Sequence, residues 1–67
     1  MDIKIKVGQN IKRLRNAKEL SQEQFAFEAD LHRTYISDIE RGNRNPTITV
    51  LEKIANALGV WPGELLK

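Results

Sequence analysis

The chain has 67 residues, a formal net charge of +2 and no cysteine. This length allows one domain, residues 1–67, and leaves too little chain for a deep pocket. Disulfides and thiolate sites are excluded, and no apolar run approaches the roughly 18 residues that cross a bilayer. The first residues, MDIKIKVGQN, lack the long apolar stretch of a signal peptide. We therefore expect a cytoplasmic protein without membrane contact.

Apolar residues recur at helical spacing along the whole chain, and no segment alternates like a β-strand. The first predicted helix covers about residues 4–18 and buries Val7, Ile11 and Leu14. Basic side chains dominate this first part of the chain, whereas acids dominate residues 19–31. Solvated helix faces are the usual explanation of such runs. A basic face for phosphates is the functional alternative, and charge alone does not decide between them.

Ser21 and Gln24 have the spacing of a capping box, which predicts a second helix from about Gln22 to Ala29. Its inward residues are expected to be Phe25, Ala26 and Ala29. A sharp turn at Asp30 follows, because Asp tolerates the left-handed conformation better than most residues. A third helix is predicted over about Arg33–Arg41, with Ile36 and Ile39 inward and Gly42 as its left-handed stop.

Thr47 is expected to cap a fourth helix, which Gly59 ends. Its predicted buried stripe consists of Ile48, Leu51, Ile54, Ala55 and Leu58. Val60 then supplies the apolar contact of a Schellman stop. Pro62 suits the first position of a short fifth helix, which Leu65 would anchor.

The spacing Gln22-x3-Ala26-x3-Asp30-x5-Ile36 is typical of a helix-turn-helix. Ala26 is small enough to pack against the next helix, Asp30 makes the turn, and Ile36 points back into the core. The second helix of such a motif enters the major groove of DNA and presents its N-terminal half to base edges. The pattern therefore predicts an all-α fold that binds double-stranded operator DNA.

Three outward residues at the start of the third predicted helix are the candidates for base contacts: Arg33, Thr34 and Ser37. An arginine can bond guanine O6 and N7 together, which is worth about 1–3 kcal/mol of discrimination. Thr34 can bond a base edge or touch a thymine methyl group. Ser37 lies one turn beyond Arg33 and can reach a base or a phosphate.

A second group is expected at the DNA backbone or the minor groove: Gln22, Tyr35, Asn43 and Arg44. Gln22 opens the second helix, where free N–H groups and the helix dipole favour a phosphate. Tyr35 has two interpretations of equal weight, a phosphate contact and half-buried packing. Arg44 likewise contacts DNA or is simply exposed.

These motifs resemble the Cro and phage-repressor type of helix-turn-helix proteins, which are also called Xre-like. The resemblance covers about residues 7–66 and rests on Ile11-x-x-Leu14-Arg15, Leu20-Ser21-Gln22, Ala26-x3-Asp30-x5-Ile36, Ile39-Glu40-Arg41-Gly42, Pro46-Thr47 and Leu51-x-x-Ile54-Ala55-x-Ala57-Leu58-Gly59-Val60. It implies a compact, λ-repressor-like domain of five helices, with the helix-turn-helix at the second and third. It also implies a homodimer on palindromic operators and a structural ion pair between Arg15 and Glu40.

Within this family, the segments Arg33-Thr34-Tyr35-Ile36-Ser37 and Ile39–Asn45 look most like the small controller proteins of restriction–modification systems. The chain departs from the family pattern at three positions. Asp30 replaces the glycine favoured at the turn. His32 stands where a small cap is usual, so the cap is lost or His32 contacts phosphate, and an exposed turn residue is favoured. Trp61 precedes Pro62 in place of a small polar cap.

Trp61 has two interpretations, a lid over the end of the fourth helix and an anchor of the dimer. We favour the dimer, with an interface built from Val50, Leu58, Val60 and Trp61. Phe27 has no assigned role. Glu23 and Glu28 make RNA polymerase a further candidate partner, although simple solubility is the favoured explanation of these acids.

Two other classes of function compete with the DNA-binding regulator. A protein-interaction module or an antitoxin could use the same fold, as could a phage-type repressor, but a pure interaction module has no need of the cluster around Arg33. An enzyme needs a nucleophile with a base, paired carboxylates in a cleft or a metal cluster. We therefore expect no catalysis, no cofactor, no metal site and no small-molecule ligand.

Overall fold

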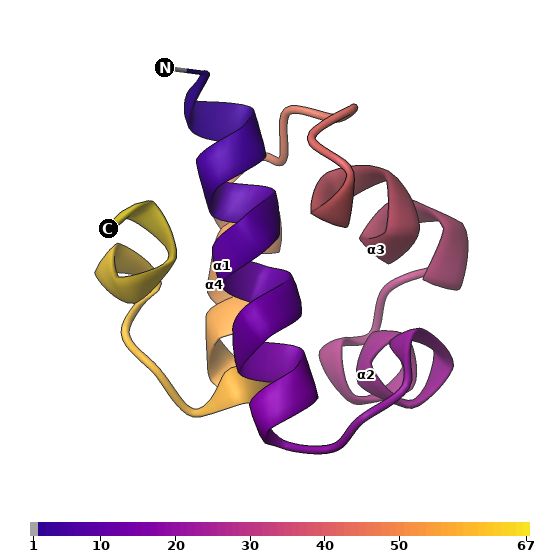
Figure 1. The fold of residues 1–67 in the computed structure, drawn as a ribbon. Helices are drawn as coiled ribbons and strands as arrows, with labels where there is room; N and C mark the ends of the chain where they lie inside the picture. The colour runs from indigo at the N-terminus through magenta and orange to yellow at the C-terminus, as the bar shows by residue number, and fades with distance from the viewer. Residues whose placement is uncertain (1) are drawn as a thin grey trace.

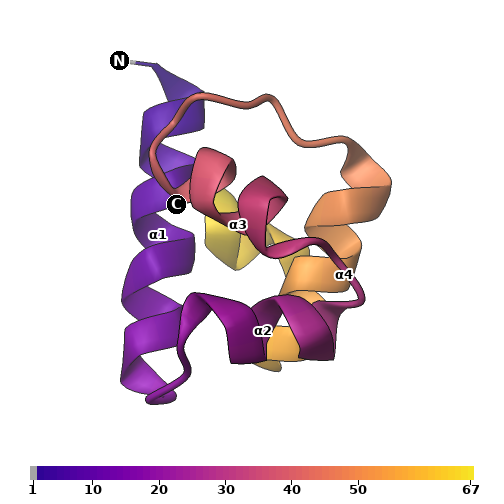
Figure 2. The same cartoon turned by 90° about the vertical axis from the view of Figure 1, so that its right-hand side faces the viewer.

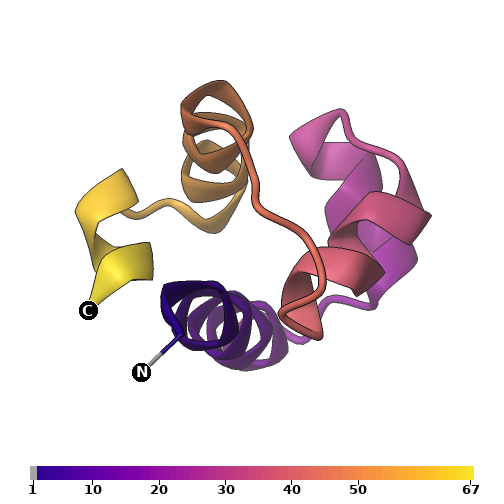
Figure 3. The ribbon, with the colours of Figure 1, turned by 90° about the horizontal axis from the view of Figure 1, so that it is seen from above.

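The structure, a computed structural model, describes residues 2–67. In this range the chain forms four α-helices and one 3-10 helix: α1 (Ile3–Ala17), α2 (Gln22–Ala29), α3 (Arg33–Glu40), α4 (Ile48–Leu58) and η1 (Pro62–Leu66). Helices α1 and α4 run through the middle of the molecule, with α2 and α3 on one side and η1 on the other (Figure 1). The view from above shows the same arrangement (Figure 3). The expected all-α fold is confirmed.

The prediction of a fifth α-helix is wrong, because Pro62–Leu66 form a 3-10 helix. The N–H of Glu64 donates to the carbonyl of Trp61 at 2.9 Å, which is the tighter i→i+3 pattern. Short segments commonly adopt it. Pro62 does occupy the first position, and Leu65 is fully buried as expected.

The helix ends follow the predicted capping residues. Ser21 and Gln24 form the reciprocal capping box, with hydrogen bonds of 3.0 and 2.9 Å. The Thr47 hydroxyl accepts from the N–H of Val50 at 3.1 Å. Gly42 and Gly59 both have left-handed backbones, with φ of 77° and 73°. Helices α1 and α3 each end one residue earlier than expected, at Ala17 and Glu40.

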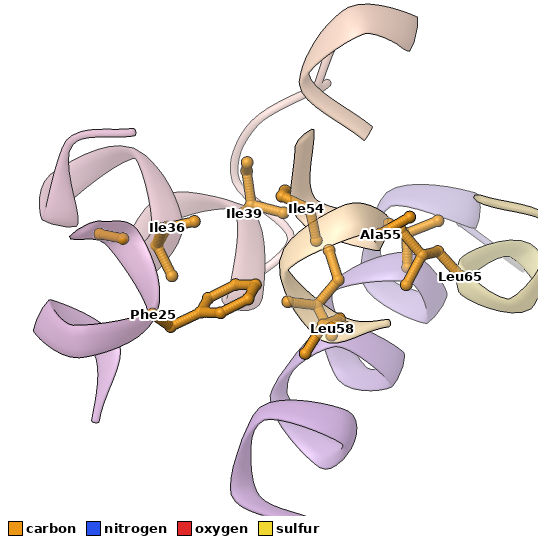
Figure 4. Close-up of a cluster of buried hydrophobic side chains, with 10 residues drawn as sticks. Phe25, Ile36, Ile39, Ile54, Ala55, Leu58 and Leu65 are labelled. Atoms are coloured by element: carbon orange, nitrogen blue, oxygen red, sulfur yellow. The ribbon is translucent and has the colours of Figure 1, made fainter. Parts of the chain in front are cut away.

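The core is formed by apolar side chains from all five elements. Its buried members are Val7, Ile11, Phe25, Ala26, Ala29, Ile36, Ile39, Ile54, Ala55, Leu58 and Leu65. Phe25 extends from α2 toward Leu58 of α4, and Ile36 and Ile39 cover it from α3 (Figure 4). The inward faces predicted for α2 and α3 are therefore confirmed.

Gly8 allows α1 and α3 to approach closely. A Cβ atom at this position would clash with the carbonyl oxygen of Ile39 and lie 2.9 Å from that of Glu40. Only glycine avoids this contact, so α1 fixes where the C-terminal end of α3 lies.

The expected burial of Ile48 is wrong, and one of the two interpretations of Trp61 is excluded. Ile48 is 86% exposed rather than part of the buried stripe, because it lies at the first position of α4, beyond the packed core. Trp61 is 83% exposed and so does not act as a lid. Within residues 2–67, none of the helices is both long and apolar enough to cross a bilayer.

Candidate nucleic-acid interface

The connection between α2 and α3 is the sharp turn that the sequence predicts. Asp30 has a left-handed backbone, with φ 56° and ψ 46°. The N–H of Leu31 donates to the carbonyl of Ala26 at 2.9 Å, which closes the end of α2. Helix α3 then lies above α2 in this view, on the face of the molecule that is turned to the viewer (Figure 2). This is the geometry of a helix-turn-helix, in which the second helix is free to enter a groove.

His32 caps α3, which corrects the expectation of a lost cap. Its Nδ1 atom accepts a hydrogen bond from the N–H of Thr34 at 3.1 Å. An imidazole nitrogen can accept a hydrogen bond only when it carries no proton. The ring is exposed, as expected. A histidine thus replaces the usual small cap and satisfies one free N–H at the start of α3.

The three residues expected at base edges lie together at the N-terminal half of α3. Arg33 and Thr34 are exposed, and Ser37 is partly exposed one turn later. A shallow hollow of about 150 Å³ is lined by Arg33, Thr34, Ser37 and Gln22. The start of α2 and the start of α3 therefore contribute to one polar surface.

Gln22 has a partner that the sequence did not reveal. Its side-chain nitrogen donates to Oε1 of Glu40 at 3.0 Å. The same carboxylate accepts from Arg15, at 2.7 Å from Nε and 3.0 Å from Nη2, so the ion pair implied by the family resemblance is present. Arg15 also donates to the carbonyl of Leu20 at 2.8 Å. One buried carboxylate thus joins α1, α2 and α3.

A second ionic cluster lies at the C-terminal end of α3. The Arg44 guanidinium stacks over the Tyr35 ring, 4.6 Å from its centre. One oxygen of Asp38 is 3.6 Å from Arg44, and the other is 2.6 Å from Arg41. Sequence reasoning missed Asp38, although its spacing of three from Arg41 is typical of a helical ion pair. Asn43 is exposed in the loop that follows.

The predicted dimer interface is altered by the burial of Leu58. This side chain is only 3% exposed and packs inside the single chain, so it is removed from the predicted interface. Val50 and Val60 are partly buried, and Trp61 projects into solvent at the connection between α4 and η1. The exposed apolar surface here is therefore smaller than expected and centres on Trp61.

The acids of α2 surround an exposed aromatic ring. Phe27 is 86% exposed, and a shallow hollow beside it is lined by Glu23, Gln24 and Glu28. Both glutamates are exposed, as expected from the sequence. This acidic surface lies on α2, apart from the polar surface at the start of α3.

Comparisons with known proteins agree with this geometry. The Helix-turn-helix family matches residues 11–65. Control protein C.BamHI of Bacillus amyloliquefaciens is 54% identical over 66 residues, which are 97% of this chain and 82% of that protein. Control protein C.MunI of Mycoplasma sp is 52% identical over 65 residues, which are 96% of this chain and 88% of that protein.

A solved structure is similar over nearly the whole fold. The restriction–modification controller protein C.AhdI from Aeromonas hydrophila superposes with a TM-score of 0.90 at 45% identity, over 92% of this chain and 94% of that chain. The family match spans most of the sequence, and α2, the turn and α3 have the arrangement that major-groove binding requires. The chain belongs to the helix-turn-helix family of DNA-binding transcriptional regulators.

Proposed function

We propose that two copies of this chain bind a palindromic operator and control the genes of a restriction–modification system from the cytoplasm. One observation carries the proposal: Arg33, Thr34 and Ser37 face solvent together at the start of α3. The N-terminal half of a recognition helix is the part that meets base edges. The names of the similar proteins, control proteins and restriction–modification controllers, support the narrower assignment.

In this proposal Arg33 is the principal base-reading residue. Its side chain is exposed, and its guanidinium can donate to O6 and N7 of one guanine. Thr34 and Ser37 contact the neighbouring bases. Because Thr34 follows Arg33 directly and Ser37 lies one turn further, the three side chains can reach adjacent positions of one half-site.

Four further residues hold the DNA backbone or enter the minor groove: Gln22, Tyr35, Asn43 and Arg44. The N–H groups at the start of α2 favour a phosphate, and Gln22 stands at that start. The bond from Gln22 to Glu40 keeps its side chain beside α3. Arg44 and Tyr35 are stacked on each other, so they would approach the backbone as one unit.

The dimer would form through the surface around Trp61, with Val50 and Val60 beside it. An aromatic ring that is 83% exposed is an unfavourable feature for an isolated chain but a typical anchor of an interface. A twofold dimer would place two α3 helices about 34–36 Å apart, which matches half-sites one helical turn apart. This spacing links the dimer to palindromic operators.

Selection of bound duplexes from a random pool tests the proposal. The expected product is a palindrome with half-sites about one helical turn apart, and binding should weaken steeply as salt rises. Binding without any enriched sequence would exclude specific recognition. An enriched site without twofold symmetry would exclude the dimer but not the use of α3.

We infer further that the acidic surface of α2 contacts RNA polymerase when the operator lies next to a promoter. The exposed acids Glu23 and Glu28 flank the exposed ring of Phe27, which suits a partner that combines basic and apolar groups. A Glu23→Gln, Glu28→Gln double variant should lose activation of transcription and keep its operator affinity. Unchanged activation would remove polymerase as a partner of this surface.

A further inference from the structure

Asp38 lies between two arginines at the C-terminal end of α3. Its Oδ1 atom is 2.6 Å from a guanidinium nitrogen of Arg41, and its Oδ2 atom is 3.6 Å from one of Arg44. The Asp38 side chain is 22% exposed, whereas the arginines are 62% and 51% exposed. One carboxylate is thus enclosed by two basic groups that remain open to solvent.

The Tyr35 ring completes this arrangement. The Arg44 guanidinium lies 4.6 Å above the centre of the ring while it faces the Asp38 carboxylate. A planar guanidinium that stacks on a ring and pairs with an acid is held at two sites. Arg44 therefore belongs to a defined cluster, although it lies in the loop after α3.

The cluster lies on the DNA-facing side of α3. Asp38 follows Thr34 by four residues, and Arg41 follows Asp38 by three, so all three share one face of the helix. A phosphate that approaches this face would meet Arg41 and Arg44 with an acid already between them. The acid and the phosphate would compete for the same two cations.

Neither helix propensity nor the helix dipole explains an aspartate at this position. Aspartate is among the weaker helix formers, and an acid in the last turn of a helix opposes the helix dipole. Asp38 stands in the last turn of α3, which ends at Glu40. We therefore look for the role of the Asp38 side chain in its pairing with the two arginines.

We propose that Asp38 is an internal counter-ion that limits the affinity of this chain for DNA. This inference rests on the proposed function, since it assigns a role within the same DNA-binding surface. To neutralise a phosphate, Arg41 or Arg44 must leave Asp38, and the freed carboxylate then faces the DNA. Each complex with DNA consequently gains less binding free energy than two unpaired arginines would provide, whatever the base sequence.

The salt dependence of binding carries the signature of this competition. Each phosphate that a cation neutralises releases counter-ions and adds roughly 0.9 to the slope of log affinity against log salt. An arginine that only exchanges Asp38 for a phosphate adds little, because the vacated carboxylate attracts a cation in turn. Removal of the Asp38 charge should therefore steepen the slope, which a change in fold stability alone would not do.

The test compares Asp38→Asn with the wild-type chain on an operator duplex and on a non-specific duplex over a salt series. Asp38→Asn should bind both duplexes about threefold to tenfold more tightly at low salt, because each exposed ion pair changes an equilibrium constant by up to about fivefold and Asp38 pairs with two arginines. The salt slope should steepen by about one to two. Asp38→Ala should show the same gain in affinity and the same steeper slope.

Two controls isolate the mechanism. In an Arg41→Ala, Arg44→Ala background, Asp38→Asn should change neither affinity nor slope. Glu28→Gln, which removes one negative charge from α2, should leave the slope unaltered in the wild-type background. If Asp38→Asn still raised the affinity for DNA in the absence of the two arginines, the effect would be a general effect of charge. That result would overturn the proposal.

The remaining outcomes separate this inference from the proposed function. Weaker binding by Asp38→Asn would mean that Asp38 positions the arginines or accepts from a cytosine amino group, and the proposal would be wrong. Unchanged affinity and slope would also overturn it, while wild-type binding would leave the proposed function intact. A wild-type chain that binds no duplex would overturn both.

Discussion

Arg15 and Glu40 form a buried, two-pronged ion pair that joins α1 to α3. The two bonds measure 2.7 and 3.0 Å, and the side chains are only 9% and 2% exposed. The Gln22 side chain donates to the same carboxylate from α2. Both helices of the helix-turn-helix are thus attached to α1 at one point, which sets the orientation of the DNA-binding surface.

Glu40→Ala should lower the free energy of unfolding by about 3–5 kcal/mol, because it leaves the buried Arg15 charge without its partner. Urea denaturation at fixed protein concentration measures the loss. Glu64→Ala is the matched control, since it removes an exposed ion pair with Lys67 and should cost no more than about 1 kcal/mol. Similar losses in the two variants would contradict a structural role for the buried pair.

Gly8→Ala should destabilise the fold, although alanine normally stabilises a helix by about 0.5–1 kcal/mol relative to glycine. The added Cβ meets the backbone carbonyls of Ile39 and Glu40, which cannot move without shifting α3. We expect the free energy of unfolding, measured by thermal or urea denaturation, to fall by about 1–3 kcal/mol. Gly63→Ala should be close to neutral, since nothing lies within 4 Å of a Cβ there.

Glu19→Gly should stabilise the fold. Glu19 has a left-handed backbone, with φ of 59°, in the turn after α1. This conformation costs a non-glycine residue about 1–2 kcal/mol, and the greater freedom of glycine in the unfolded chain offsets part of the gain. The melting temperature should rise, whereas Glu28→Gly, inside α2, should lower it. A lower melting temperature for Glu19→Gly would show that the Glu19 side chain makes a compensating contact.

Trp61→Ala should dissociate the dimer at micromolar concentration, as measured by sedimentation. Interface anchors typically contribute about 2 kcal/mol or more, so the dimer should weaken by roughly 30-fold or more. Phe27→Ala removes an equally exposed aromatic ring from α2 and should leave sedimentation unchanged. Loss of the dimer in Phe27→Ala alone would place the interface on α2.

Much of the fold could be predicted because its signals are local. The capping box at Ser21, the turn at Asp30 and the left-handed Gly42 depend on residues close in sequence, and each occurs where expected. Burial at the ends of helices could not be predicted in this way. Ile48 has the spacing of a buried residue, but α4 begins beyond the core.

The candidate site was predictable in part for the same reason. Helical spacing places Arg33, Thr34 and Ser37 on one surface, because all three belong to one helix. The bond from Gln22 to Glu40 joins residues 18 apart, and the proximity of Arg44 to Asp38 depends on the path of a loop. Such contacts follow from the packing of separate elements, which spacing does not specify.

We propose that α3 reads bases through Arg33. This claim is tested by selection from a random duplex pool by Arg33→Ala beside the wild-type chain, with Gln22→Ala as a control. Arg33→Ala should lose preference at one position in each half-site and keep it elsewhere, whereas Gln22→Ala should bind all sequences more weakly but select the same site. An unaltered selected sequence with Arg33→Ala would contradict the claim.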